Sequence, residues 1–144
     1  MKKILFVLFV LAAYIFVGCE SNDNDGASKF DGEWAFVADY DNQYGWDYYY
    51  DESDIYIKVC DNSIAFYETD EWGFSFDNGN YECSRDDFEY VVSATLEIDG
   101  DRAYFEVFDE AGYLEVKGEK LYYYDPADED GYYMVFERIK KFTE

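Results

Sequence analysis

Apolar and polar residues alternate along most of the chain after residue 30, and turn residues interrupt this pattern at short intervals. Ile55, Ile57 and Val59 fall on one face of a predicted strand. Alternation with a period of two predicts strands that bury one face. The longest stripe of this kind consists of Tyr90, Val92, Ala94, Leu96 and Ile98. Further alternating segments lie at residues 64–67, 72–76, 103–107, 114–116, 121–124 and 132–139.

Short polar segments predict tight turns between these strands. They are Asn78-Gly79, Asp99-Gly100 and Lys117-Gly118-Glu119. Outside the N-terminal apolar run, no window of about a dozen residues has apolar positions at helical spacing. The pattern therefore predicts an all-β domain, an antiparallel up-and-down meander of about eight to ten strands. We expect the meander to close into a barrel or a two-sheet sandwich, because an open sheet edge promotes aggregation.

Both ends of this pattern resemble lipocalins. Gly32-Glu33-Trp34 is similar to the Gly-x-Trp motif that begins lipocalin barrels, and residues 132–139 resemble the closing strand of small bacterial lipocalin-like lipoproteins. By strand pattern, the resemblance covers roughly residues 30–140. It implies a barrel whose motif tryptophan packs, at the closed end, against a basic side chain of the last strands. Trp34 and Arg138 occupy the matching positions, and a cation–π contact would join them.

The N-terminal residues predict export and lipidation. Two lysines precede an uncharged apolar run at residues 4–17, and acidic residues follow Cys19. This order is typical of a secretory signal peptide. Cys19 after Gly18 resembles a bacterial lipobox, with Phe16 in place of the usual leucine. The run is shorter than the roughly 20 apolar residues that a spanning helix needs, so lipidation is favoured over an anchor helix or plain secretion.

This resemblance implies cleavage before Cys19, acylation of the protein at Cys19 (palmitate among the acyl groups), and a place at the outer membrane or cell surface of a Gram-negative bacterium. The predicted organisation is a signal peptide over residues 1–18, the lipidated cysteine with an acidic flexible tether over 19–29, and a lipocalin-like barrel over 30–144. Asp23 and Asp25 resemble an acidic export signal of surface lipoproteins, and whether the protein faces the periplasm or the cell surface stays open.

The predicted mature chain is strongly acidic. The full chain has 11 basic and 34 acidic residues; residues 1–18 hold two lysines and no acid, which leaves 9 basic residues and a net charge of −25. This charge excludes nucleic acid as a partner, because affinity for phosphates comes from lysine and arginine. Aromatic residues make up 23% of the chain, which indicates a folded domain rather than a disordered one.

Little in the sequence indicates catalysis or metal binding. The chain has no histidine, and this removes the usual general base and the commonest metal ligand. The acidic loops at residues 51–54 and 125–130 do not match the calcium-loop pattern, so we interpret them as solvated. We predict no enzyme activity, metal or cofactor. In an oxidising compartment, a disulfide between Cys60 and Cys83 is slightly favoured over two buried thiols.

The aromatic residues leave two kinds of function open. Inward-facing rings predict a barrel that is largely filled. Exposed rings can stack on a small molecule or sugar, or contact a protein, and Trp46 and Trp72 are candidates for such a platform. The predicted function is therefore a monomeric, non-enzymatic, membrane-anchored lipocalin-like lipoprotein that binds an unidentified ligand or partner. The alternative is an acidic interaction protein that captures cationic proteins or peptides, as lipoprotein inhibitors of lysozyme do.

Overall fold

A computed structural model of the protein describes residues 28–128 and 131–143. The predicted signal peptide, Cys19 and most of the predicted tether lie outside these residues. In the described part, the only helical segment is the short 3-10 helix η1. The elements are β1 (Gly32–Asp41), β2 (Gly45–Tyr48), β3 (Ile55–Cys60), β4 (Ser63–Glu68), β5 (Phe76–Asp77), β6 (Asn80–Tyr81), η1 (Arg85–Asp87), β7 (Glu89–Thr95), β8 (Glu97–Asp99), β9 (Arg102–Val107), β10 (Glu110–Lys117), β11 (Lys120–Tyr124), β12 (Tyr133–Arg138) and β13 (Lys141–Phe142).

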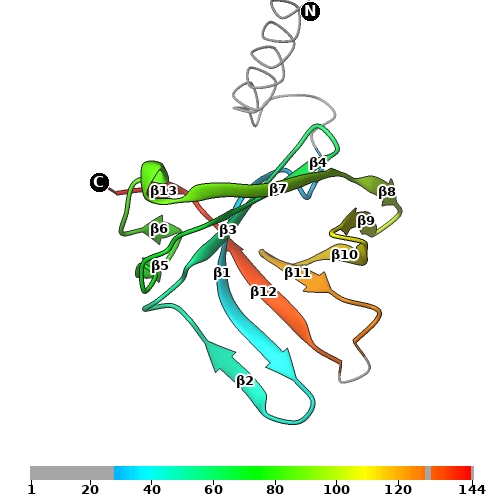
Figure 1. Ribbon diagram of the computed structural model, residues 1–144, viewed down its shortest axis with the longest axis horizontal. Coiled ribbons are helices and arrows are strands. Elements are labelled where there is room, and N and C mark those ends of the chain that lie inside the picture. Colours follow the sequence, from blue (N-terminus) through cyan, green and yellow to red (C-terminus); the bar gives the residue numbers. More distant parts are fainter. Residues whose placement is uncertain (1–27, 129–130, 144) are drawn as a thin grey trace, which may run out of the picture.

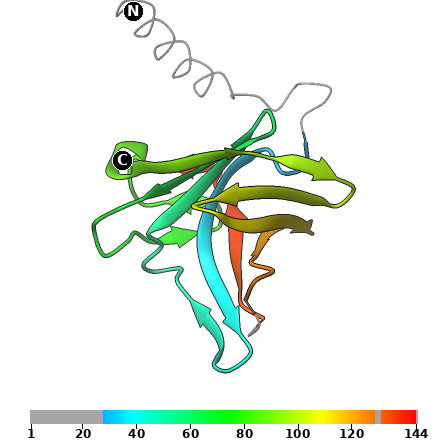
Figure 2. The same ribbon diagram turned by 45° about the vertical axis from the view of Figure 1, so that its right-hand side comes forward.

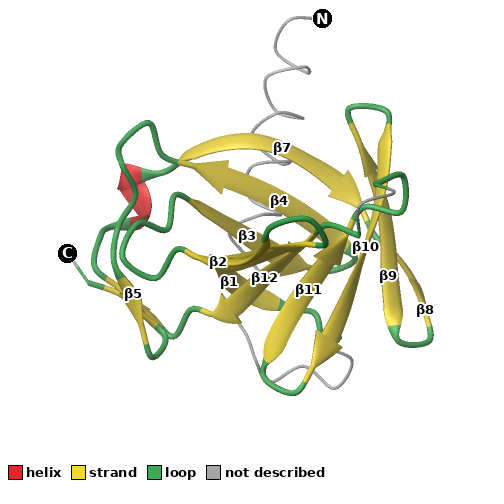
Figure 3. Ribbon diagram, turned by 90° about the horizontal axis from the view of Figure 1, so that it is seen from below, coloured by secondary structure: helices red, strands yellow, loops and turns green. Residues whose placement is uncertain are grey.

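Ten of these strands form one antiparallel sheet that curves round into a nearly closed barrel (Figures 1 and 3). The strand order is β7-β4-β3-β1-β12-β11-β10-β9-β8, and β2 pairs with β1 beside this path. Only Leu96 separates the two end strands β7 and β8, so one continuous segment pairs with β4 and then with β9. Figure 2 shows this segment crossing the upper part of the barrel. The predicted all-β, up-and-down meander is therefore confirmed.

Large apolar side chains fill the barrel interior. Trp34 and Phe136 are fully buried, and Phe36 and Phe105 are each 5% exposed. Removing such rings from water is the main favourable contribution to folding, at about 25 cal/mol per Å² of apolar surface. The buried residues of this cluster are Phe30, Trp34, Phe36, Ile57, Val59, Ile64, Leu96, Ala103, Phe105, Leu114, Leu121 and Phe136.

A β-bulge in β1 changes which side chains face the interior. The register between β1 and β12 shifts between Phe36 and Ala38, so Val37 is an extra residue in β1. Phe36 points into the barrel, whereas Val37 and Ala38 pack on its outer face. After the bulge the alternation is reversed, and Asp39 reaches the interior side. A shift of one residue exchanges the two faces of every following side chain in a strand.

A second apolar cluster covers the outer face of β1, β3 and β12. The segment between β4 and β7 provides it, together with β13, which pairs in parallel with β6. Within this layer Tyr81 is fully buried, and its hydroxyl donates to the Ser53 carbonyl oxygen at 3.0 Å. The Ser53 hydroxyl donates in turn to the carbonyl oxygen of Phe36 at 2.6 Å. These bonds fix the segment before β3 against β1, at the end of the barrel where β1 ends.

Gly32, Trp34 and Arg138 close the opposite end of the barrel. The guanidinium carbon of Arg138 lies 4.1 Å from the centroid of the buried Trp34 ring, and its Nη1 donates to the carbonyl oxygen of Asp31 at 2.7 Å. The indole nitrogen of Trp34 donates to the carbonyl oxygen of Phe30 at 2.9 Å. At Gly32, φ is +139° and an added Cβ would lie 2.3 Å from Arg138 Nη1, so a side chain there would strain the backbone and displace the guanidinium. The structure thus places Trp34 and Arg138 in the contact that the lipocalin resemblance implies.

The predicted disulfide between Cys60 and Cys83 is wrong, because Cys83 is a free, buried cysteine. Cys60 pairs with Ser63, which is level with Thr95 at the last residue of β7. Cys83 precedes η1 and therefore lies near the first residue of β7. A seven-residue strand spans about 20 Å, whereas a disulfide needs Cα atoms within about 7 Å of each other. An even number of cysteines therefore does not show which of them are neighbours in the fold.

Two predicted strands differ from the structure in detail. Residues 72–76 contribute one bridge, between Phe74 and Ser53, before the two-residue strand β5. The stripe at residues 90–98 is interrupted, because a register shift between β4 and β7 turns Tyr90 to the outside, where it is 57% exposed. Within residues 28–128 and 131–143, no helix has the length and apolar character needed to cross a membrane.

We predict that Arg138→Gln lowers the free energy of unfolding by about 1–2 kcal/mol. The substitution removes both the cation–π contact with Trp34 and a hydrogen bond from a charged donor. Urea denaturation of the purified barrel domain measures the change. Arg102→Gln is the matched control, because Arg102 also covers an aromatic ring, that of Tyr113 at 4.5 Å, but on the exposed outer face. Equal effects of the two substitutions would contradict a special role for the closed end.

The carboxyl of Asp31 predicts a pH-dependent stability. Its Oδ2 accepts the backbone N–H of Ser28 at 3.2 Å, and its Oδ1 is buried without a hydrogen-bond partner among the described residues. Burial raises the pKa of Asp31 above its ordinary value of 3.8. The folded protein therefore holds this proton more tightly than the unfolded chain, and stability contributed by Asp31 at low pH is lost as pH rises through the raised pKa.

We therefore expect the difference in unfolding free energy between Asp31→Asn and the wild-type protein to shift in favour of the variant as pH rises from below 3.8 to neutrality. Denaturation curves at a series of pH values measure this difference. Because every other titrating group is common to both proteins, a difference that is constant with pH would contradict the assignment to Asp31.

Candidate ligand site at the open end of the barrel

The barrel has a cleft of about 600 Å³ at the end opposite Arg138. Drug-sized ligands typically occupy cavities of about 300–1,000 Å³. The cleft lies where β1 ends and where β3 and β12 begin, and the segment after β4 borders it. Its lining residues are Phe36, Asp39, Tyr49, Glu52, Asp54, Ile55, Asp70, Glu71, Trp72, Tyr132 and Met134.

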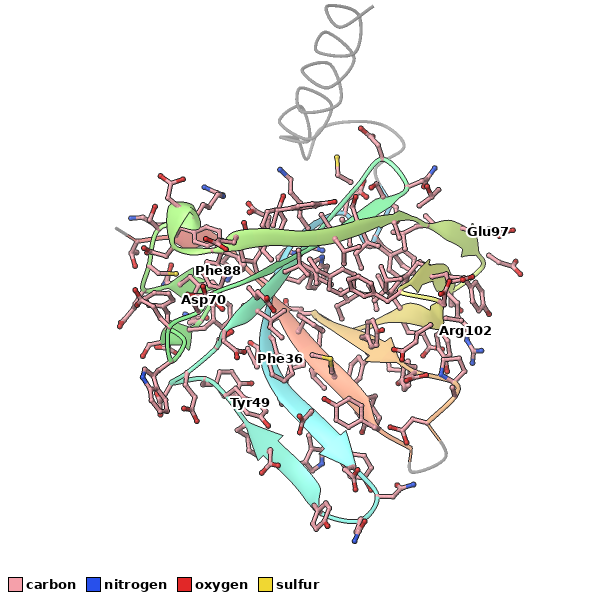
Figure 4. The ribbon with its side chains drawn as sticks, in the orientation of Figure 1. Phe36, Tyr49, Asp70, Phe88, Glu97 and Arg102 are labelled. Carbon is pink, nitrogen blue, oxygen red and sulfur yellow. The ribbon has the colours of Figure 1, made fainter. Side chains whose placement is uncertain are left out.

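Asp39 is held in the cleft by two tyrosines from different segments. The hydroxyl groups of Tyr49 and Tyr132 each donate to Asp39 Oδ2 at 3.2 Å. Tyr49 is itself fixed by stacking on Phe36, with ring centroids 4.8 Å apart. Figure 4 shows Phe36 and Tyr49 side by side in the lower half of the barrel. The Val37 bulge is what brings Asp39 to this position, since without it Ala38 would face inward.

Both tyrosine hydroxyls remain protonated at neutral pH. Burial and the neighbouring Asp39 carboxylate raise the pKa of Tyr49 to about 12. The same two causes, burial first, raise the pKa of Tyr132. A protonated hydroxyl can donate and a carboxylate can only accept, so the direction of both hydrogen bonds is fixed. The two hydroxyl groups therefore orient the Asp39 side chain in the cleft.

The described residues that line the cleft include several acids and no base. Asp39 and Asp54 are half-buried, whereas Glu52, Asp70 and Glu71 are exposed at the rim. In the described part of the chain, none of the five forms an ion pair; the ion pairs present involve Glu33, Asp101, Glu115 and Glu137. The carboxylates also do not converge on one point, because no group of three or more candidate metal ligands is found among the described residues.

The remaining walls of the cleft are apolar or aromatic. Phe36, Ile55 and Met134 belong to the barrel core or pack against it, and they form its inner part. Trp72 borders the cleft in the segment after β4, and 93% of its surface is exposed. An exposed tryptophan at the rim of an apolar and acidic cleft can contact a ligand that enters it.

The two predicted platform tryptophans lie in different places. Trp72 lines the cleft, but Trp46 belongs to an array of rings on the outer face of the sheet that crosses β2, β1, β12, β11, β10 and β9. We call this array the aromatic ladder; successive ring centroids are 5.0–6.1 Å apart, and its members are Tyr48, Trp46, Tyr40, Tyr133, Tyr124, Tyr113 and Tyr104.

The arrangement of the aromatic ladder indicates a structural role in the sheet. Successive rings contact one another, and three of the six pairs are stacked, so the rings are engaged in packing along the sheet. Lys117 donates to the Tyr124 hydroxyl at 2.7 Å and lies over its ring, so a cation of the chain already occupies part of this face. Cross-strand aromatic pairs each stabilise a sheet by about 0.2–1 kcal/mol. The ladder therefore explains the surface tyrosines without a ligand.

Sequence reasoning found part of the cleft. The acidic loop at residues 51–54 was interpreted as solvated, yet Glu52 and Asp54 line the cleft. Asp39 and Tyr132 were not identified, because 93 positions separate them in the chain. Strand pairing between β1 and β12 brings them together, and the bulge sets the face. No family model matches the chain, and no curated protein matches it either.

Proposed function

We propose that this protein is a non-enzymatic lipoprotein, held at the outer membrane through Cys19, whose lipocalin-like barrel binds a small ligand in the cleft at its open end. The observation that carries the proposal is the difference between the filled core of the barrel and the cleft at its open end. Buried apolar side chains fill the core of the barrel, and its open end holds a cleft of about 600 Å³ with oriented polar groups. A concave, partly apolar site with a few convergent polar groups is the usual form of a ligand site.

The position of the tether supports a ligand that arrives from the aqueous side. Ser28 and Lys29 lie at the closed end, where Lys29 forms an ion pair with Asp101 at 2.9 Å. Eight residues lie between Cys19 and Ser28, and the nine Cα-to-Cα steps of an extended chain over this span reach about 30 Å. An acyl anchor on Cys19 would therefore attach the barrel through its closed end and leave the open end accessible from the aqueous side.

A second candidate function is the capture of cationic proteins or peptides. The net charge of −25 for the predicted mature chain favours it, as do the unpaired acids around the cleft. Attraction between distant surface charges is screened beyond about 8 Å at physiological salt. The two functions therefore differ in size of ligand and in dependence on salt.

For the anchor, we predict that the wild-type protein fractionates with membranes and that Cys19→Ala releases it or leaves it uncleaved. Acylation needs the thiol of Cys19, and more than one acyl chain is required for stable attachment. Detergent extraction, followed by mass spectrometry of the N-terminal peptide, measures both results. An unmodified N-terminus in the membrane fraction would contradict the lipoprotein assignment.

For the cleft, we predict that the neutral fluorophore N-phenylnaphthylamine binds the purified barrel with a stoichiometry of about one, as expected if it occupies the cleft with its partly apolar walls. Met134→Trp should abolish this binding, because the larger side chain extends from the cleft wall. Tyr104→Trp, on the outer face, is the control and should leave binding unchanged. Fluorescence titration measures all three proteins, and circular dichroism checks their folding.

The same titration distinguishes the second candidate. Binding of the neutral fluorophore should be nearly independent of salt, whereas capture of a cationic protein such as lysozyme should weaken steeply as salt is added. Absence of fluorophore binding, together with tight lysozyme binding at physiological salt, would overturn the ligand-binding proposal in favour of protein capture.

A further inference from the structure

We propose that the cleft selects an organic cation, an amine or guanidinium group carried on an apolar body, and that Asp39 is the residue that anchors the cationic group. This inference rests on the proposed function, since it names the class of ligand that the cleft takes. It depends on the composition of the walls, on the orientation of Asp39 and on the separation of the acids from one another.

The charge of the walls determines the sign of the ligand. The titratable groups among the described lining residues are five carboxyl groups and two tyrosine hydroxyls, with no lysine or arginine. An anionic ligand would have to approach five carboxylates with no compensating base, which is strongly unfavourable. A neutral ligand would partly desolvate the half-buried carboxylates Asp39 and Asp54 without supplying a positive charge to either. A cation satisfies both groups.

The arrangement of the carboxylates determines the kind of cation. Calcium and magnesium require several oxygen ligands around one point. The cleft acids are distributed along its walls, and in the described residues they do not form a group that could hold a metal ion. An extended organic molecule can instead place its charged group beside one carboxylate and its apolar part elsewhere in the cleft.

Asp39 has the geometry of an anchor. Tyr49 and Tyr132 both donate to Asp39 Oδ2 at 3.2 Å, so Asp39 Oδ1 receives no hydrogen bond from either tyrosine. An ammonium or guanidinium group has several N–H donors and no acceptor, and it complements this oxygen. The ring of Tyr49, stacked on Phe36, lies beside the same position and can contribute a cation–π contact.

The apolar walls accommodate the body of the ligand. Ile55, Met134 and Phe36 line the inner part of the cleft, and Trp72 stands exposed at the rim. Each buried methylene group of a ligand contributes about 0.8 kcal/mol. Selectivity for a cation with an apolar body over an inorganic cation follows from these walls.

The test compares three probes of nearly equal shape: phenethylamine, a cation; phenethyl alcohol, which is neutral; and hydrocinnamate, an anion. Calorimetric titration of the purified barrel domain in 0.15 M salt measures each dissociation constant, with distant charges screened beyond about 8 Å. We expect phenethylamine to bind at least about tenfold more tightly than the other two, as one charge-assisted hydrogen bond provides.

Three variants locate the effect. Asp39→Asn keeps an acceptor for the two tyrosine hydroxyls but removes the charge, and it should reduce phenethylamine binding to the level of the alcohol. Asp54→Asn should also weaken phenethylamine binding. It is the variant to measure if Asp39→Asn does not fold. Glu97→Gln removes the same charge from the far side of the barrel, as the labelled positions in Figure 4 show, and should have no effect.

Each other result overturns the inference in a distinguishable way. Equal affinity for the three probes, with N-phenylnaphthylamine still bound, would reject the cation class and leave the ligand-binding function. Equal weakening by Glu97→Gln and Asp39→Asn would assign the selectivity to overall charge rather than to the cleft. Absence of binding by every probe, the neutral fluorophore included, would reject both proposals.

Discussion

The extra residue Val37 in β1 is the constraint that lets one strand fill the barrel core before it and line the cleft after it. β1 pairs with β12 along one side and with β3 and then β2 along the other, so its side chains contribute to every layer of the molecule. Before the bulge it buries Trp34 and Phe36 in the barrel; after it, the alternation is reversed. A regular strand would place Ala38 and Tyr40 inside and Asp39 on the outer face. With the bulge, Asp39 reaches the cleft and Tyr40 joins the aromatic ladder.

The rigidity needed to hold a half-buried carboxylate comes from aromatic packing on both faces of the sheet. Inside, the stacked pair of Phe36 and Tyr49 connects the barrel core to the cleft. Outside, the aromatic ladder joins six strands, and the layer around Tyr81 holds the segment before β3. Each cross-strand ring pair contributes only about 0.2–1 kcal/mol, but the pairs share strands and reinforce one register. The high content of tyrosine is therefore explained by the construction of the sheet more than by binding.

The sequence predicted what depends on local pattern and missed what depends on one-residue shifts. Alternation and glycine turns were sufficient for the meander, and Gly32 and Trp34 were sufficient to place the closed end. The bulges at Val37 and between β4 and β7 leave no local signal, because an extra valine fits a strand as well as a regular one. The sequence pattern therefore did not indicate a face for Asp39. It placed Tyr90 on the wrong face. The Cys60 and Cys83 pairing failed for a similar reason, since a count of cysteines carries no information about distance.

The distinction between acids that keep a protein soluble and acids that recognise a ligand lies in their surroundings rather than in their number. An exposed carboxylate interacts through water, where two unit charges 4 Å apart attract by about 1 kcal/mol; at the effective dielectric of a protein surface the same pair reaches about 4 kcal/mol. Most of the acids of this chain are of the first kind. Asp39 and Asp54 are half-buried beside apolar walls, and Asp39 is also oriented by two hydroxyl groups whose protons are retained at neutral pH. A large net charge therefore concentrates cations near the surface without selecting among them, whereas selection requires the few carboxylates that the fold removes from water.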